Sequence, residues 1–161
     1  CFMNAANLIS AATEDAKAIT DPLDQFEEEQ LASAYGAGAD VRIKGQLKRS
    51  MDAAGKDLAK RQKARSTRTV RDQIDRALVD LMGLYRDVLF IQFDSGVPLI
   101  NEEMRPQLSQ LARQGSANDT GRRLRAISYA RAQVQANVTP LLAMESLMVE
   151  LKDPWIRSAT A

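Results

Sequence analysis

The feature that most constrains the fold is an apolar stripe between residues 70 and 91. Its members alternate at spacings of four and three, and they are Val70, Ile74, Ala77, Leu81, Leu84, Val88 and Ile91. An α-helix repeats every 3.6 residues, so this spacing places all of them on one helical face. Four more apolar side chains widen that face, namely Leu78, Met82, Tyr85 and Leu89. A face this broad predicts a core helix of a bundle rather than the narrow seam of a two-stranded coiled coil.

Helical spacing also dominates the N-terminal part of the chain. The pattern predicts a first helix from about Asn4 to Ile19, which stops before Asp21-Pro22 because proline disrupts a helix interior. Asp21 as N-cap and Pro22 as first helical residue then favour a second, short helix to about Ala34. Gly36 and Gly38 follow as helix-ending residues.

A long helical stretch is expected from Ile43 onward, and a break near Ser66-Thr67 is left open. Its first part carries only a thin stripe, made of Leu47, Met51, Ala54 and Leu58, and it contains two helix-weakening glycines. We therefore expect this part to be marginal, projecting, or ordered only by a partner.

Helix-breaking and helix-capping residues divide the C-terminal part into shorter helices. Asp94 to Pro98 breaks the pattern, and Asn101 then suits the N-cap of a helix that ends near Gly115. Another helix is expected from about Thr120 to Gln135 after a polar loop at 116–121, with Leu124, Ile127 and Val134 on its inner face. Thr139 as N-cap and Pro140 as first residue begin the last helix, which ends before Pro154. This helix carries Leu141, Leu142, Met144, Leu147, Met148 and Leu151, and we expect Leu142, like Leu81, to lie in the core. The fold class predicted is all-α, a bundle of about six helices.

These elements predict four regions. Residues 1–39 hold helices that lead into the bundle, residues 40–69 form a basic, projecting or flexible insertion, and residues 70–153 form the main bundle. Residues 154–161 are a tail, in which Trp155 is expected to act as a packing anchor.

Composition removes most catalytic chemistry. The 161 residues include no His and one Cys, so a Cys/His zinc site and a His-dependent nucleophilic triad are excluded. Gly36-Ala37-Gly38 lacks the lysine and the preceding strand of a phosphate-binding loop. We expect no catalytic residue, no cofactor and no metal in this chain.

Two sets of carboxylates lie within the expected helices. Asp72 and Asp75 stand at helical spacing, but a di-metal bundle site lacks its usual histidine ligands here. Glu145 lies on or beside the apolar stripe of the last helix. We expect it to be buried or half-buried and satisfied by Arg131 or by the amide of Asn137, because an unpaired buried charge is costly.

Charge is unevenly distributed although the total is only +1. Residues 1–35 carry seven acidic side chains and one Lys, whereas residues 36–71 carry eleven basic and three acidic ones. The candidate nucleic-acid contacts in this stretch are Lys44, Lys48, Arg49, Lys56, Lys60, Arg61, Lys63, Arg65 and Arg68. No aromatic residue is interleaved, so any DNA binding would be weak, non-specific and sensitive to salt. A solvated helix face is the favoured interpretation.

The chain begins with Cys1 and lacks a signal-peptide pattern, so we read it as an excerpt of a longer protein. No apolar run approaches the ~20 residues of a membrane span. A soluble, cytoplasmic protein without membrane contact is expected.

The C-terminal third resembles a known family. The segment from Arg131 to Met148, with Asn137, Pro140, Leu142 and Glu145 as the matching positions, is similar to the pattern that closes the C-terminal collar domain of bacterial clamp-loader subunits. Leu58 to Arg68, Ile74 to Leu81 and Tyr85 to Leu89 look like the delta-prime subunits of DNA polymerase III in high-GC Gram-positive bacteria. The resemblance spans roughly residues 40–152, and the long basic stretch at 42–71 departs from more compact relatives.

The resemblance implies a non-catalytic scaffold. In that family a helical third domain joins a collar with the gamma/tau and delta subunits and holds the ATPase modules that load the sliding clamp onto primed DNA. The ATPase-type domains are absent from this chain, so it would be the collar domain alone, with the four matching residues serving folding before interface. A stand-alone basic helical module that binds nucleic acid is the alternative, and a helical enzyme domain is least supported.

Overall fold

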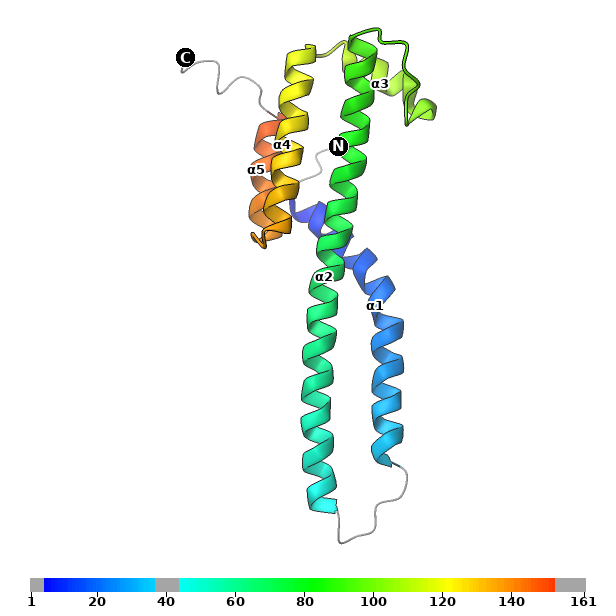
Figure 1. Cartoon of the computed structure of the whole chain (residues 1–161), viewed down its shortest axis with the longest axis vertical. Coiled ribbons are helices and arrows are strands. Elements are labelled where there is room, and N and C mark those ends of the chain that lie inside the picture. The colour runs from blue at the N-terminus through cyan, green and yellow to red at the C-terminus, as the bar shows by residue number, and fades with distance from the viewer. Residues whose placement is uncertain (1–4, 37–43, 153–161) are drawn as a thin grey trace. The chain divides into compact units, whose positions relative to one another are not determined.

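The computed structural model describes residues 5–36 and 44–152, apart from the side chains of residues 36 and 44–47. Within these ranges the elements are α1 (Ala5–Gly36), α2 (Lys44–Gln92), the short 3-10 helix η1 (Glu102–Met104), α3 (Arg105–Ala112), α4 (Ala117–Gln135) and α5 (Pro140–Lys152). The described residues contain no strand, so the predicted all-α class is confirmed (Figure 1). None of these helices is long and apolar enough to cross a membrane.

The chain divides into two compact units. One comprises Ser10–Gln73, and the other comprises Cys1–Ile9 together with Ile74–Ala161. We call the first the hairpin unit and the second the bundle unit. Each is described by itself.

The predicted break at Asp21-Pro22 is wrong, because α1 continues through Pro22 as one helix of 32 residues. Proline removes one backbone donor and crowds the preceding turn, which kinks a helix, and Figure 1 shows α1 changing direction along its length. Burial of Ala16 and Thr20 before the proline and ion pairing of Glu27 after it hold both sides helical. Tertiary contacts thus outweigh the local signal.

In the hairpin unit, the first part of α2 packs antiparallel to α1. Arg65 of α2 forms ion pairs with Asp24 and Glu27 of α1, and Gln62 donates a hydrogen bond of 3.1 Å to the backbone carbonyl of Asp24. Leu58 is buried. These contacts explain why the thin apolar stripe suffices for a helix, since polar pairing with α1 supplements it.

Helix α2 runs without a break at Ser66-Thr67. Thr67 and Thr69 donate their hydroxyl groups to the backbone carbonyls of Lys63 and Arg65, four residues earlier. Threonine in a helix interior is accommodated in this way because its hydroxyl hydrogen bonds to the preceding turn.

The bundle unit is built from the last turns of α2 with α3, α4 and α5 (Figure 1). Its largest fully buried apolar side chains come from three helices, and they are Ile74, Leu78, Val88, Ile127, Val134, Met144 and Leu147. A second cluster joins Val88 to Leu108 and Ala112 of α3. Leu81, which lies on the predicted stripe, is only partly buried.

Asn101 lies at the N-cap position of η1, but its side chain makes no cap hydrogen bond. It donates instead to Oδ2 of Asp87 at 2.9 Å. The predicted N-cap position of Asn101 is therefore confirmed, but the capping hydrogen bond is absent, because the side chain is turned to donate its amide N–H to a buried carboxylate on α2.

Helix α4 begins at Ala117, earlier than the predicted Thr120, because Ser116 is the N-cap of a capping box with Asp119. Its other end is closed by Asn137, which has a φ of 65°. The backbone N–H of Asn137 donates to the carbonyl of Val134, and that of Val138 donates to Gln133. This is a Schellman end, and it places Pro140 to begin α5 as predicted.

Candidate interaction surfaces

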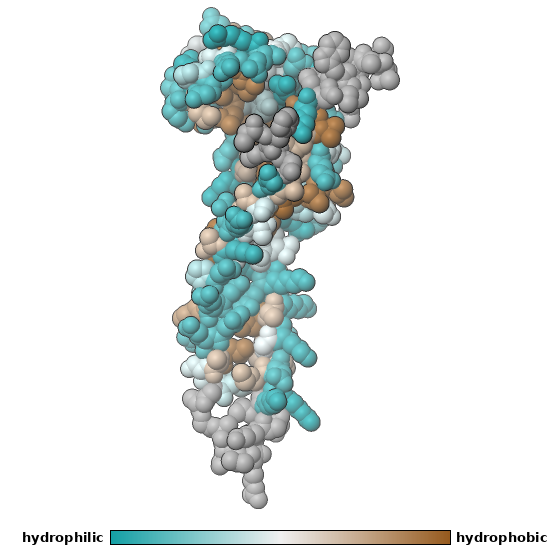
Figure 2. All heavy atoms as spheres, turned by 180° about the vertical axis from the view of Figure 1, so that it is seen from behind, coloured by the Kyte–Doolittle hydropathy of each residue, from teal (hydrophilic) through white to brown (hydrophobic). Residues whose placement is uncertain are grey.

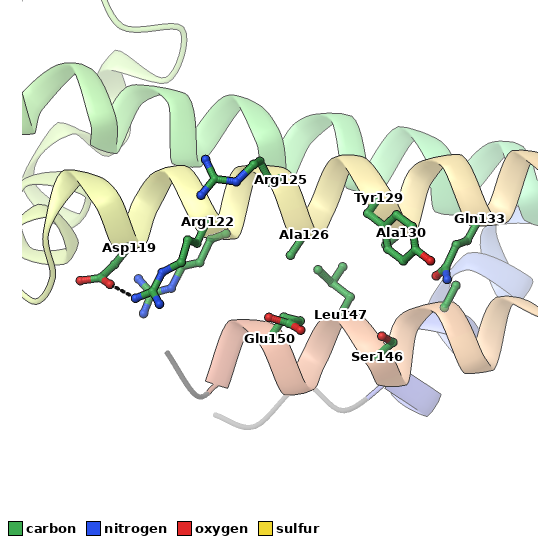
Figure 3. Close-up of a pocket in the computed structure, with 12 residues that line it drawn as sticks. Asp119, Arg122, Arg125, Ala126, Tyr129, Ala130, Gln133, Ser146, Leu147 and Glu150 are labelled. Atoms are coloured by element: carbon green, nitrogen blue, oxygen red, sulfur yellow. Dashed lines mark hydrogen bonds and ion pairs between the residues drawn. The ribbon is translucent and has the colours of Figure 1, made fainter. Parts of the chain in front are cut away.

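A groove of about 560 Å³ lies between α4 and α5 in the bundle unit (Figure 3). Small side chains, Ala126 and Ala130 on α4 and Ala143 on α5, form part of its lining. Leu147 points from α5 toward α4. Small residues at facing positions leave this space because they fill less of the gap between two packed helices.

Charged side chains gather along one stretch of the groove. Arg122 pairs with Asp119, and Glu150 of α5 also lines this part. Hydrogen bonds from the side chain and backbone of Ser116, with the pairing of Arg122, lower the pKa of Asp119 from its usual 3.8 to about 2. Asp119 is therefore a permanent anion at neutral pH.

Two polar atoms of groove-lining residues are buried without a hydrogen-bond partner among the described residues. They are Nε of Arg123 and Oε1 of Gln133. The Arg123 guanidinium lies 5.8 Å from the centroid of the Tyr85 ring, so its charge rests on an aromatic face. Buried polar atoms normally have hydrogen-bond partners. These two atoms therefore give the groove a donor and an acceptor that a bound molecule could use.

Exposed apolar side chains occur on both helices beside the groove. Tyr129 of α4 lines it and is 64% exposed. Leu142 and Val149 of α5 are 60% and 61% exposed. These two stand seven residues apart and share one helical face. We call Tyr129, Leu142 and Val149 the apolar rim.

The expectations for Leu142 and Glu145 as buried residues are wrong, since both are exposed. The reason is rotational: Ala143, Met144 and Leu147 form the buried face of α5, and positions 142 and 145 turn away from it.

Arg131, the expected partner of Glu145, pairs with Asp75 of α2 instead. Its Nε and one terminal nitrogen donate to the two carboxylate oxygens at 2.6 and 3.0 Å. Gln135 adds a hydrogen bond of 3.2 Å. The bidentate bond to Arg131 is the main cause that lowers the pKa of Asp75. Asp75 is thus structural, and it joins α2 to α4.

Asn137 and Pro140 both lie in the connection between α4 and α5. Asn137 occupies the left-handed position described above, and Pro140 is the first residue of α5. Of the four residues matched to the family pattern, these two shape the chain, whereas Leu142 and Glu145 face solvent.

The nine basic residues predicted as candidate nucleic-acid contacts differ in their surroundings. Arg65 is taken up by Asp24 and Glu27, whose hydrogen bonds raise its pKa. Seven others are exposed on α2, namely Lys48, Arg49, Lys56, Lys60, Arg61, Lys63 and Arg68. The side chain of Lys44 lies outside the described residues, as does Trp155 in the tail. Figure 2 shows hydrophilic side chains projecting from the hairpin unit.

No group of three His, Cys, Asp or Glu side chains in the described ranges is arranged to hold a metal ion. Of the predicted carboxylate pair, Asp72 is exposed and Asp75 is occupied by Arg131.

Comparison of the chain with protein-family models, with curated proteins and with solved structures found no match.

Sequence reasoning missed the groove and its rim. A usable signal was present: Tyr129 is a large ring between Ala126 and Ala130, beyond the predicted inner face of its helix. The expected burial of Leu142 is wrong because Ala143, Met144 and Leu147 form the buried face of α5, and both Leu141 and Leu142 are exposed. Apolar spacing alone does not say which face of a leucine-rich helix is covered.

Proposed function

We propose that this chain is a non-catalytic oligomerisation domain, the collar domain of a delta-prime-type subunit of the DNA polymerase III clamp loader. In this role it holds the gamma/tau and delta subunits beside it while their ATPase modules load the sliding clamp onto primed DNA. The proposal places the chain in the cytoplasm and assigns polymerase activity to the holoenzyme that it helps to assemble.

The observation that carries the proposal is the exposure of Leu142 and Val149 on one face of α5. Large apolar side chains that share an outer helical face, beside a groove, are typical of protein interfaces. Full burial of each such side chain against a partner contributes about 1.5–3 kcal/mol. Leu142 is also one of the positions on which the family resemblance rests.

The proposal shifts the role expected of the matched residues. Leu142 and Glu145 are available to a neighbouring subunit because neither is used in the core of this domain. An apolar contact beside a carboxylate suits a partner helix that presents leucine-like side chains and one cation.

Co-purification tests the proposal. The whole chain is expected to form a complex with the gamma/tau and delta proteins of the same organism. Val149→Glu places a charge in the apolar rim and should weaken that complex at least tenfold. Val97→Glu is the matched control, since Val97 is 43% exposed in the connection between α2 and η1.

A wild-type chain that binds neither partner would overturn the proposal. An equal loss of binding in both variants would also contradict it, because the effect would then come from charge in general and not from the α5 face. Circular dichroism of each variant verifies that the helices are retained.

A further inference from the structure

Four cations of the hairpin unit lie on the side of α2 that faces away from α1. Leu58, Gln62 and Arg65 define the inner side, because Leu58 is buried and the other two bond to α1. At 100° per residue, four exposed cations lie on the opposite side of the helix, and they are Arg49, Lys56, Lys60 and Lys63. We call these four residues the basic ridge.

The ridge runs along one side of a single helix. Its residues lie within one uninterrupted helix, and a rise of about 1.5 Å per residue spreads them over about 21 Å. Lys56 and Lys63 are seven residues apart, as are Arg49 and Lys56, so they recur on one line. Asp52 and Asp57 flank the ridge and leave its net charge positive.

The opposite helix of the hairpin carries the other sign of charge. Exposed acids on α1 include Asp15, Glu28 and Glu29. Between the two helices of the hairpin unit, Arg65 of α2 pairs with Asp24 and Glu27 of α1. A polyanion is therefore repelled by the α1 side and attracted by the ridge, so it can approach the hairpin in one orientation.

We propose that the basic ridge binds the phosphate backbone of duplex DNA without regard to base sequence. Cations aligned along one side of a continuous helix match a rod of phosphates, whose charge lies every 1.7 Å or so along its axis. Residues 44–73 contain no aromatic side chain, so the stacking surface that single strands use is absent from this part of α2.

Other polyanions fit this surface less well. An anionic membrane would require large apolar side chains beside the cations, but the exposed neighbours Ala53, Ala64 and Thr67 are small. An acidic protein partner would require an apolar anchor at the centre of the surface, and the ridge has none. This inference is independent of the proposed collar function, because it concerns a different unit and a different ligand.

Fluorescence anisotropy of the whole chain with a labelled duplex of about 25 base pairs tests the inference. With four phosphate contacts the binding constant should fall about 100-fold between about 50 and 200 mM salt. Two duplexes of unrelated sequence should bind equally.

The triple variant Lys56→Gln, Lys60→Gln, Lys63→Gln removes three of the four cations while keeping good helix formers. Its affinity at about 100 mM salt should fall at least tenfold, and its salt slope should decrease by about 3. The control is Arg76→Gln, Arg113→Gln, Arg125→Gln, which removes the same charge from exposed positions of the bundle unit. The control should bind within about twofold of the wild type.

Three outcomes overturn the inference. One is no duplex binding by the wild type at about 100 mM salt. Another is an equal loss in both triple variants, which would reduce the effect to net charge. The last is ridge-dependent binding of anionic phosphatidylglycerol vesicles in place of the duplex, which would assign the ridge to lipid.

Discussion

Asp87 on α2 and Asn101 before η1 are joined by two hydrogen bonds to a single carboxylate oxygen. Oδ2 of Asp87 accepts from the backbone N–H of Asn101 at 2.8 Å and from its side-chain amide at 2.9 Å. The other oxygen accepts from the backbone N–H of Ile100 at 3.1 Å and pairs with Arg86 at 3.1 Å. The Asp87 side chain is fully buried, so this carboxylate fixes the connection that follows α2.

Asp87→Asn should lower the free energy of unfolding by about 1–3 kcal/mol, since an amide nitrogen would face buried N–H donors that need an acceptor. Urea denaturation measures the change. Asp80→Asn is the control on the same helix, because Asp80 is exposed, and it should alter stability by less than about 0.5 kcal/mol. Equal stability of the two variants would contradict the structural role of Asp87.

The stability of the chain should decline in acid. Burial raises the pKa of Asp87, but the hydrogen bonds from Asn101 and Ile100 and the charge of Arg86 outweigh it, so the net pKa lies below its usual 3.8. A carboxyl with a lowered folded-state pKa stabilises the fold above its unfolded pKa, and this contribution is lost as the pH falls through the folded value.

The Asp119 carboxyl shares this sign, and its contribution is lost as the pH falls from 3.8 to about 2. Thermal unfolding from pH 7 to acid should therefore show a midpoint that falls mainly below about pH 4. In Asp87→Asn the fall should be smaller. A midpoint that rises on acidification would show that these carboxylates are not ionised partners in the fold.

Two leucines on α5 offer a matched comparison of core and surface. Leu147 is 2% exposed and Leu142 is 60% exposed. Leu147→Ala should destabilise by about 2–5 kcal/mol because it leaves a cavity, whereas Leu142→Ala should change stability by less than about 0.5 kcal/mol. Denaturant unfolding of both variants checks the assignment, and a reversed order would mean that α5 is rotated.

Asn137 should be replaceable by glycine but not by alanine. Its φ of 65° is left-handed, a conformation that glycine adopts freely and that costs a side chain with a Cβ roughly 1–2 kcal/mol. Asn137→Gly should be neutral or slightly stabilising, and Asn137→Ala should destabilise by about 1 kcal/mol. Thermal unfolding distinguishes the two, and identical midpoints would exclude the left-handed geometry.

Periodicity predicted the helical class and placed α4 and α5 close to their observed bounds. The helix break predicted at Pro22 is wrong. Proline removes one backbone donor, but the burial of Ala16 and the ion pair of Glu27 keep the helix continuous, and neither contact can be recognised from local sequence. Periodicity also failed at Ser116, which the loop-like composition of its surroundings concealed although Asp119 completes a capping box.

The candidate site was harder to predict than the fold. The basic residues of α2 could be identified from the sequence, but the separation of Arg65 from Lys56, Lys60 and Lys63 required the position of α1. The groove between α4 and α5 is lined by small residues of both helices. The apolar pattern of one helix does not show which residues of another helix will face it, so the groove could not be predicted from the sequence.

The sequence by itself determined which residues share a helical face, because the repeat of 3.6 residues is a property of each helix alone. Only the tertiary structure decided which face is covered. Arg131 bonds to Asp75, 56 residues away, rather than to Glu145, and Leu142 faces solvent while Leu147 is buried. Burial and ion pairing depend on where the neighbouring helix lies, and that position is set by the packing of the whole unit rather than by local spacing.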